Sequence, residues 1–208
     1  MNYMNATAKT ASMLKVLDYT KANKSWFDER GLHAGYHSVL IQGEKVKGQR
    51  DPELRLAKID YDFSGKRVLD IGCSNGGLLH ALADRIAFGA GIDFNSKCIN
   101  AANALKAVNG TSNIHFYSFN LDKEDLSLLS HFIFSEPVDI CFFLNISLWV
   151  KKWKDVFLYC STLTGSMLFE AHGDASQQSS QIEFVRSVYS NVVQLSEQSD
   201  DDPTYAKR

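Results

Sequence analysis

The sequence predicts a doubly wound α/β domain, in which a mostly parallel sheet carries helices on both faces. From Ser64 onward, short apolar runs of the kind buried on both faces alternate with segments whose apolar residues recur at helical spacing. Strands that alternate with helices in this way build a parallel sheet. The chain has 208 residues and is 45% hydrophobic, which is enough for one domain with a substantial core.

The predicted elements follow one another along the chain. The apolar runs predict strands at residues 66–72, 89–94, 114–119, 138–144, 166–172 and 192–197. The segments with helical spacing predict helices at residues 76–87, 96–108, 123–132, 151–163 and 180–190. We therefore assign residues 64–208 to the α/β domain.

Residues 1–63 precede this alternation, and we expect them to form a helical lid over the carboxyl edge of the sheet. Residues 11–27 can form an amphipathic helix. Residues 33–59 predict a loop or hairpin, followed by a helix that starts near Pro52. This lid would contribute part of a substrate pocket.

Composition excludes several classes of function. The formal net charge of −2 gives no global positive field for nucleic acid, although a local basic patch stays open. The four cysteines are far apart and form no C-x-x-C pair, so we expect no disulfide framework and no metal site. No apolar run approaches the roughly 20 residues that span a bilayer. We expect a cytoplasmic protein without a membrane partner.

The stretch VLDIGCSNGG, residues 68–77, ends the first predicted strand in an acid and continues in a glycine-rich loop. In a doubly wound sheet this turn forms the floor of the ligand site. Gly72 and Gly76 have no Cβ, so a ligand could approach the backbone closely. A dinucleotide motif would place glycine at Ser74, and a P-loop would need lysine after Gly77. The loop therefore lacks the residues with which these two motifs bind phosphate.

This loop resembles motif I of the class I S-adenosylmethionine-dependent methyltransferases, an acid followed by x-G-x-G-x-G, with serine in place of the middle glycine. The resemblance implies S-adenosyl-L-methionine as the cofactor. It implies cofactor contacts from the motif residues, which are Asp70, Gly72, Cys73, Ser74 and Gly76.

Later strand ends extend the resemblance. Asp93 matches the acid that binds the cofactor ribose, and Phe94 would lie beside the adenine. Asn120 stands where the family usually has an acid for the adenine amino group, and its carbonyl oxygen can still accept that bond. Leu121 would offer a backbone amide to the ring. The end of the fourth strand resembles motif IV and points to Asn145, Ser147 and Trp149 near the transferred methyl group.

The segment before the loop resembles the lead-in of the ubiquinone-type O-methyltransferases, where an arginine binds the methionine carboxylate. Arg55 matches that position. For the substrate we predict contacts with Tyr36, His37 and Trp149. The candidate catalytic bases are His37 and His172, although a structural hydrogen bond explains a histidine such as His37 equally well.

The resemblance implies a methyltransferase that acts on a small-molecule or sugar-like acceptor. Two alternatives stay open. One is a tRNA- or RNA-modifying methyl- or alkyltransferase, with Lys45, Lys47, Arg50 and Lys58 as phosphate contacts. The run around Trp149 and Trp153 could form a stacking platform for bases, but an amphipathic helix with a solvated lysine face explains it better. The other is a non-catalytic module that binds the cofactor.

The C-terminal stretch from Val192 stops where the family's final antiparallel strand would begin. The sequence leaves three alternatives: the chain is cut short, another element covers the sheet edge, or a second subunit covers it, which would make a homodimer.

Overall fold

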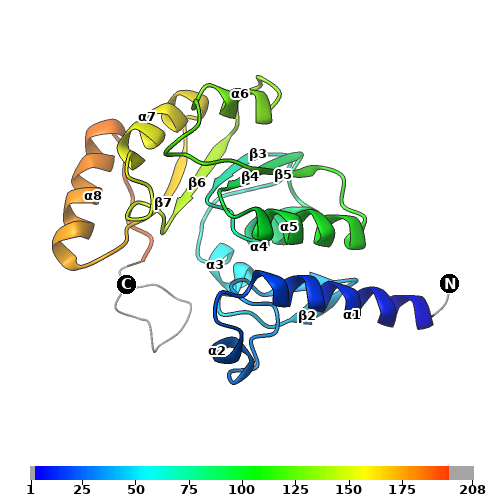
Figure 1. Ribbon diagram of the computed structural model, residues 1–208. Helices are drawn as coiled ribbons and strands as arrows, with labels where there is room; N and C mark the ends of the chain where they lie inside the picture. The colour runs from blue at the N-terminus through cyan, green and yellow to red at the C-terminus, as the bar shows by residue number, and fades with distance from the viewer. Residues whose placement is uncertain (1–2, 197–208) are drawn as a thin grey trace.

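A five-stranded parallel sheet forms the centre of the computed structural model, which describes residues 3–196 (Figure 1). Its strands are β3 (Arg67–Ile71), β4 (Phe88–Asp93), β5 (Ile114–Ser118), β6 (Ile140–Leu144) and β7 (Met167–Glu170). The order across the sheet is β5-β4-β3-β6-β7, and every pairing is parallel. The predicted doubly wound fold is therefore confirmed. The strand order reverses between β3 and β6, which is where such sheets bind ligands.

Helices cover both faces of the sheet. One face packs on α4 (Gly77–Leu82) and α5 (Ser96–Asn109), and the other packs on α6 (Leu128–Phe132), α7 (Trp153–Leu163) and α8 (Ala175–Val188). Successive side chains of β3 point to opposite faces of the sheet, so Val68 packs with α4 and Leu69 packs with α7. Within residues 3–196, no helix is both long and apolar enough to cross a membrane.

Several predicted elements differ from the structure. The predicted helix at 76–87 shortens to α4, and the one at 180–190 begins earlier, at Ala175. Residues 192–196 form no strand, and the predicted helix at 123–132 shortens to α6. The predicted helix at 11–27 is two helices, α1 (Tyr3–Thr20) and α2 (Lys24–Asp28), because Asn23 caps the second one by accepting a hydrogen bond from Trp26 N. The question of a further strand at the C-terminus lies outside the described residues.

The N-terminal segment packs mainly on α5. Met13 and Leu17 of α1 form a buried cluster with Ile41 of the hairpin β1 (Val39–Ile41) and β2 (Glu44–Val46), and with Leu105 of α5. Much of this segment therefore lies against the helix layer, as Figure 1 shows for α1. The parts of this segment that lie at the carboxyl edge of the sheet are Tyr36, His37 and α3 (Pro52–Leu56). The division at residue 63 stays a prediction.

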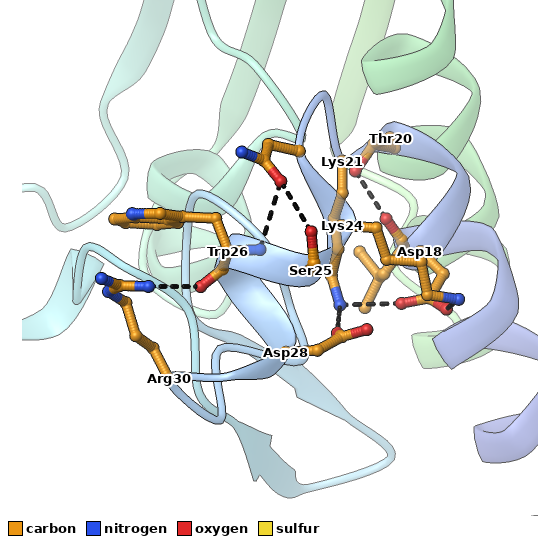
Figure 2. A network of polar contacts seen from close by, with 10 residues as sticks. Asp18, Thr20, Lys21, Lys24, Ser25, Trp26, Asp28 and Arg30 are labelled. Atoms are coloured by element: carbon orange, nitrogen blue, oxygen red, sulfur yellow. Dashed lines mark hydrogen bonds and ion pairs between the residues drawn. The ribbon is translucent and has the colours of Figure 1, made fainter.

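A polar network joins α1 to α2 (Figure 2). Lys21, whose side chain has no exposed surface, donates to Asp18 Oδ1 at 2.7 Å and to Asp28 Oδ1 at 2.8 Å. Lys24 also pairs with Asp18. A buried ammonium between two carboxylates stabilises this corner only while both partners are present. The network fixes how the chain turns from α1 toward the segment that reaches the sheet edge.

Candidate functional site

The loop after β3 is held against the end of β4. Gly72 N and Cys73 N both donate to Ile92 O, at 2.8 and 2.9 Å, and Ser74 N donates to Asp93 Oδ2 at 2.9 Å. Ser74 has a φ of 52°, in the left-handed region, like Gly72 and Gly76 on either side. The loop therefore reverses direction within a few residues and leads into α4. Asp93 helps to shape it through a direct hydrogen bond.

The two motif glycines leave room for side chains of the protein itself. A Cβ at Gly72 would lie 2.5 Å from Ile146 Cγ2, and a Cβ at Gly76 would lie 2.4 Å from Phe116 Cε1. Both residues also have φ values above 70°, which favour glycine. These contacts give both glycines a structural reason, and Gly76 is not among the residues that line the cavity described next, so close approach of a ligand to Gly76 stays a prediction.

A cavity of about 430 Å³ opens at the carboxyl ends of the strands. Gly72 forms part of its floor, and Phe119 and Ile146 contribute apolar walls. The sequence-predicted residues that line it are Tyr36, His37, Arg55, Asp70, Gly72, Asp93, Phe94, Asn120, Leu121, Asn145, Trp149 and His172. The structure thus brings residues from distant parts of the chain to one cavity, while their individual roles stay predictions.

Three predicted cofactor residues lie behind this cavity and do not line it. Cys73 is buried, and its Sγ would lie 2.9 Å from a Cβ placed on Gly91. Burial raises the pKa of the Cys73 thiol well above its usual range, so this cysteine is a packed residue without nucleophilic character. Ser74 and Gly76 shape the loop as described above.

Two residues that line the cavity each carry a buried side-chain oxygen without a hydrogen-bond partner in the described part of the chain. Asp70 is 2% exposed, and its Oδ2 has no hydrogen-bond partner among residues 3–196. Burial raises the pKa of Asp70 to about 7, although the positive charge of Arg55 acts in the opposite direction. Asn145, which has a φ of 58° at the end of β6, carries the second such oxygen, Oδ1, again counting only the described part of the chain. A buried polar atom of this kind is costly unless a ligand or water satisfies it.

The other end of the cavity contains Asp93, Phe94 and Asn120. Burial raises the pKa of Asp93, and hydrogen bonds from the backbone of Asn95 and Ser74 oppose that shift. Phe94 is 72% exposed, so its ring is available to a planar ligand. The side-chain oxygen of Asn120 already accepts a hydrogen bond from Asp122 N at 3.1 Å. To accept a hydrogen bond from an adenine amino group, the Asn120 oxygen would therefore have to use its second lone pair.

Arg55 reaches the cavity from α3, where Asp51 caps the helix and Pro52 starts it. The Arg55 guanidinium forms an ion pair with Glu170 at the end of β7. Glu170 Oε1 also lies 3.6 Å from Arg50 Nη1. Glu170 is not among the residues predicted from the sequence, although an acid near the end of the fifth predicted strand was a signal that could have identified it.

His37 is buried beside the motif loop. Its Nδ1 lies 3.1 Å from Asn75 Oδ1, and Asn75 Nδ2 donates to Ala34 O. This orientation makes Asn75 Oδ1 the acceptor, so the imidazole proton is on Nδ1 and Nε2 is an acceptor. Burial lowers the pKa of His37 to about 3, and the charge of Arg55 adds to this shift. His37 is consequently a neutral side chain and a weak base.

His172 is fixed at the cavity by Gln181 of α8. His172 N donates to Gln181 Oε1 at 2.9 Å, and Gln181 Nε2 donates to His172 O at 2.7 Å. Ser147 Oγ donates to the same Gln181 oxygen. The ring of His172 stacks with that of Trp149 at a centroid distance of 6.0 Å, and Trp149 is 74% exposed. Nothing in the sequence singled out Gln181, because one glutamine in a helix carries no local signal.

Two of the four basic residues proposed for RNA contact, Lys45 and Arg50, form ion pairs within the protein. Lys45 Nζ lies 2.6 Å from Asp51 Oδ2 and also pairs with Glu53. Arg50 is 2% exposed, so it cannot contact a phosphate at the surface. Trp153 packs against Phe184 at a centroid distance of 5.0 Å, so it is not an open stacking platform. Arg50 is therefore not a surface phosphate contact, and the packing of Trp153 agrees with an amphipathic helix, whereas the assignments of Lys45, Lys47 and Lys58 stay predictions.

Comparisons of the sequence with known proteins agree with this geometry. Residues 62–200 match the protein family described as a methyltransferase domain. The chain is 30% identical over 116 residues to a ubiquinone biosynthesis O-methyltransferase of Neisseria meningitidis serogroup C (strain 053442). That alignment covers 54% of this chain and 43% of the relative. The chain therefore spans less than half the length of the curated relatives it matches.

Solved structures share the fold at low sequence identity. The N-terminal domain of EvdMO1 with SAH bound has a TM-score of 0.54 at 15% identity, over 72% of this chain and 66% of that chain. Precorrin 8W decarboxylase of Methanobacterium thermoautotrophicum has a TM-score of 0.51 at 15% identity, over 66% of this chain and 69% of that chain. At these identities the likeness concerns the fold alone.

Proposed function

The chain belongs to the methyltransferase-domain family and has the class I fold of the S-adenosylmethionine-dependent enzymes, and we propose that it transfers a methyl group to a small-molecule acceptor. The observation that carries this proposal is the pair of buried, unsatisfied oxygens of Asp70 and Asn145 in the same cavity as Arg55. Acceptors beside a guanidinium are complementary to an amino acid, which has an ammonium group and a carboxylate. The methionine part of the cofactor offers both, whereas NAD offers neither.

The remaining lining residues fit the nucleoside part. Asp93 has carboxylate lone pairs beyond the two hydrogen bonds it already accepts, so it can also accept from ribose hydroxyls. Phe94 offers an exposed ring to the adenine. When bound, S-adenosylmethionine supplies an activated methyl group on a sulfonium. The residues of this chain would bind that group, orient it and exclude water from it.

The mouth of the cavity supports a small acceptor. Trp149 and His172 form a stacked pair there, and Tyr36 lies on the same cavity wall. If the acceptor is a hydroxyl, His172 is the better candidate to take its proton, because His37 is buried with a pKa near 3. The relative from Neisseria is named as an O-methyltransferase, which favours an oxygen acceptor.

Calorimetry with S-adenosylmethionine, S-adenosylhomocysteine and NAD tests the cofactor. We expect both adenosyl ligands to bind and NAD to give no heat. Binding of NAD, with no heat from either adenosyl ligand, would overturn the proposal.

The acceptor is tested by incubating the protein and labelled cofactor with the metabolite and tRNA fractions of a cell extract. We expect the labelled methyl group in the metabolite fraction. Label in tRNA would favour the RNA-modifying alternative instead. Cofactor binding without label in either fraction would favour the non-catalytic module.

A further inference from the structure

Glu170 ends β7 and joins two arginines from the N-terminal segment. It forms the ion pair with Arg55, and its Oε1 lies 3.6 Å from Arg50 Nη1. The side chains of Arg50, Arg55 and Glu170 are 3%, 14% and 21% exposed, so these charges are largely removed from water. Partly buried charges interact more strongly than exposed ones, and removing one partner is costly. Glu170 therefore has a strong influence on where the Arg55 guanidinium lies.

Arg55 and Glu170 differ in the cavities that they line. Arg55 lines the 430 Å³ cavity and also a neighbouring cavity of about 760 Å³ beside β7. Glu170 lines only the second one. Arg55 thus lines both cavities, whereas its partner Glu170 lines the neighbouring cavity and is not among the lining residues of the 430 Å³ cavity. The Glu170 side chain therefore does not line the cavity in which we propose that the ligand carboxylate binds.

We propose that Glu170 is a positioning residue, which holds the Arg55 guanidinium toward the 430 Å³ cavity so that it binds the carboxylate of the methionine part. This inference rests on the proposed function. An arginine side chain has several rotatable bonds, and ordering it costs free energy that a preformed ion pair supplies in advance. One edge of the guanidinium contacts Glu170, and a planar group with five donors can serve a second carboxylate as well.

Two ligands separate this role from a general structural one. S-adenosylhomocysteine has the amino acid carboxylate, whereas 5′-methylthioadenosine has the adenosine and the sulfur but no carboxylate. Both are titrated calorimetrically into the wild-type protein, Glu170→Gln and Glu170→Asp. Glu136→Gln is the matched control, because Glu136 also pairs with an arginine, Arg67 at 3.0 Å, but does not line the cavity.

We expect Glu170→Gln to weaken the binding of S-adenosylhomocysteine about five- to twentyfold, between the scale of an ordinary hydrogen bond and that of a charge-assisted one. Its affinity for 5′-methylthioadenosine should change less than twofold. Glu170→Asp retains the negative charge, so its loss of affinity for S-adenosylhomocysteine should be smaller. In a protein that already carries Arg55→Ala, Glu170→Gln should have no further effect, because the two residues act as one unit. Glu136→Gln should bind both ligands as the wild type does.

Equal weakening of both ligands would mean a structural role and would overturn the proposal. Unchanged or tighter binding of S-adenosylhomocysteine would also overturn it, since Glu170 would then be a spectator or a competitor for Arg55. If Glu170→Gln binds neither ligand, Glu170→Asp decides by the same comparison. A wild-type protein that binds neither adenosyl ligand would instead refute the proposed function.

Discussion

The imidazole Nδ1 of His37 lies 3.1 Å from Asn75 Oδ1, and this contact joins the N-terminal segment to the loop that follows β3. Both residues are buried, at 4% and 2% exposed. A Cβ on Gly77 would lie 2.4 Å from the Cβ of His37, so the ring is tightly enclosed by the loop and the start of α4. Because His37 and Gly72 line one cavity, this contact also affects the shape of the proposed cofactor site.

The burial of His37 predicts a dependence of stability on pH. Its pKa is about 3 in the folded protein and about 6.5 when unfolded, so between these values only the unfolded chain binds the proton. The contribution of His37 to the unfolding free energy is complete above pH 6.5 and falls as the pH drops toward 3. Replacing His37 by Gln should make the unfolding free energy less pH-dependent, by up to about 1.4 kcal/mol for each pH unit in that window.

This is measured by denaturant unfolding of both proteins from pH 4 to 8. Burial lowers the pKa of His80 to about 4, so His80 titrates in the same range, but it is present in both proteins and drops out of the difference. Parallel curves for the two proteins would show that His37 is not held neutral by the fold.

The raised pKa of Asp70 predicts that cofactor affinity depends on pH. The carboxylate is charged above pH 7 and protonated below it, and only the charged form attracts the ligand ammonium. The affinity for S-adenosylhomocysteine should therefore rise roughly tenfold from pH 6 to pH 8 for a single group with a pKa of about 7. Asp70→Asn should bind more weakly at pH 8 and lose this rise. Titrations at three pH values check it, with 5′-methylthioadenosine, which lacks the ammonium, as the pH-independent control.

Asp93→Ala should weaken cofactor binding by about 1.5 to 3 kcal/mol, the scale of hydrogen bonds that involve a charged group. The same substitution removes the acceptor for Ser74 N and Asn95 N, so it should also lower the unfolding free energy. Asp93→Asn keeps one acceptor oxygen and should fall between the two proteins in both measurements. Unchanged ligand affinity in Asp93→Ala would remove this residue from the ribose site.

Arg55→Lys keeps the positive charge but loses the planar fork, so it should bind the cofactor better than Arg55→Ala and worse than the wild type. Arg55→Ala should lose roughly 1.5 to 3 kcal/mol of affinity for S-adenosylhomocysteine. Calorimetry of the three proteins gives the order. A structure with the cofactor bound and its carboxylate beyond direct hydrogen-bond distance from Arg55 would refute the assignment.

Gly76→Ala should lower the unfolding free energy by roughly 2 to 4 kcal/mol, since it combines backbone strain with a clash. The φ of Gly76 is 74°, and the new Cβ would lie 2.4 Å from the ring of Phe116. Gly65→Ala is the matched control: its φ is 68°, and nothing lies within 4 Å of the Cβ position. Backbone strain alone predicts a loss of about 1 to 2 kcal/mol there. Equal losses in denaturant unfolding would show that Phe116 simply moves aside.

The alternation of apolar runs and helical segments was by itself sufficient for the doubly wound fold. Strands buried on both faces need helices above and below them, and parallel strands need crossover connections, so few other arrangements are open. The motif after β3 and the acid at the end of β4 also predicted the edge of the sheet at which the cavity lies, because the carboxyl ends of parallel strands meet at one edge. Short elements such as α6 were less predictable, since local propensity competes there with tertiary packing.

Only the tertiary structure decided which partners these residues meet. Glu170 forms an ion pair with Arg55, and Gln181 forms hydrogen bonds with the backbone of His172. The two residues of each pair come from different parts of the fold, so the sequence does not indicate that they meet. The motif glycines face Ile146 and Phe116, which are distant in sequence. Periodicity reports which face of an element is buried, but it contains no information on which other element covers that face. Those contacts depend on how the helices and strands pack, and packing is a property of the folded chain as a whole.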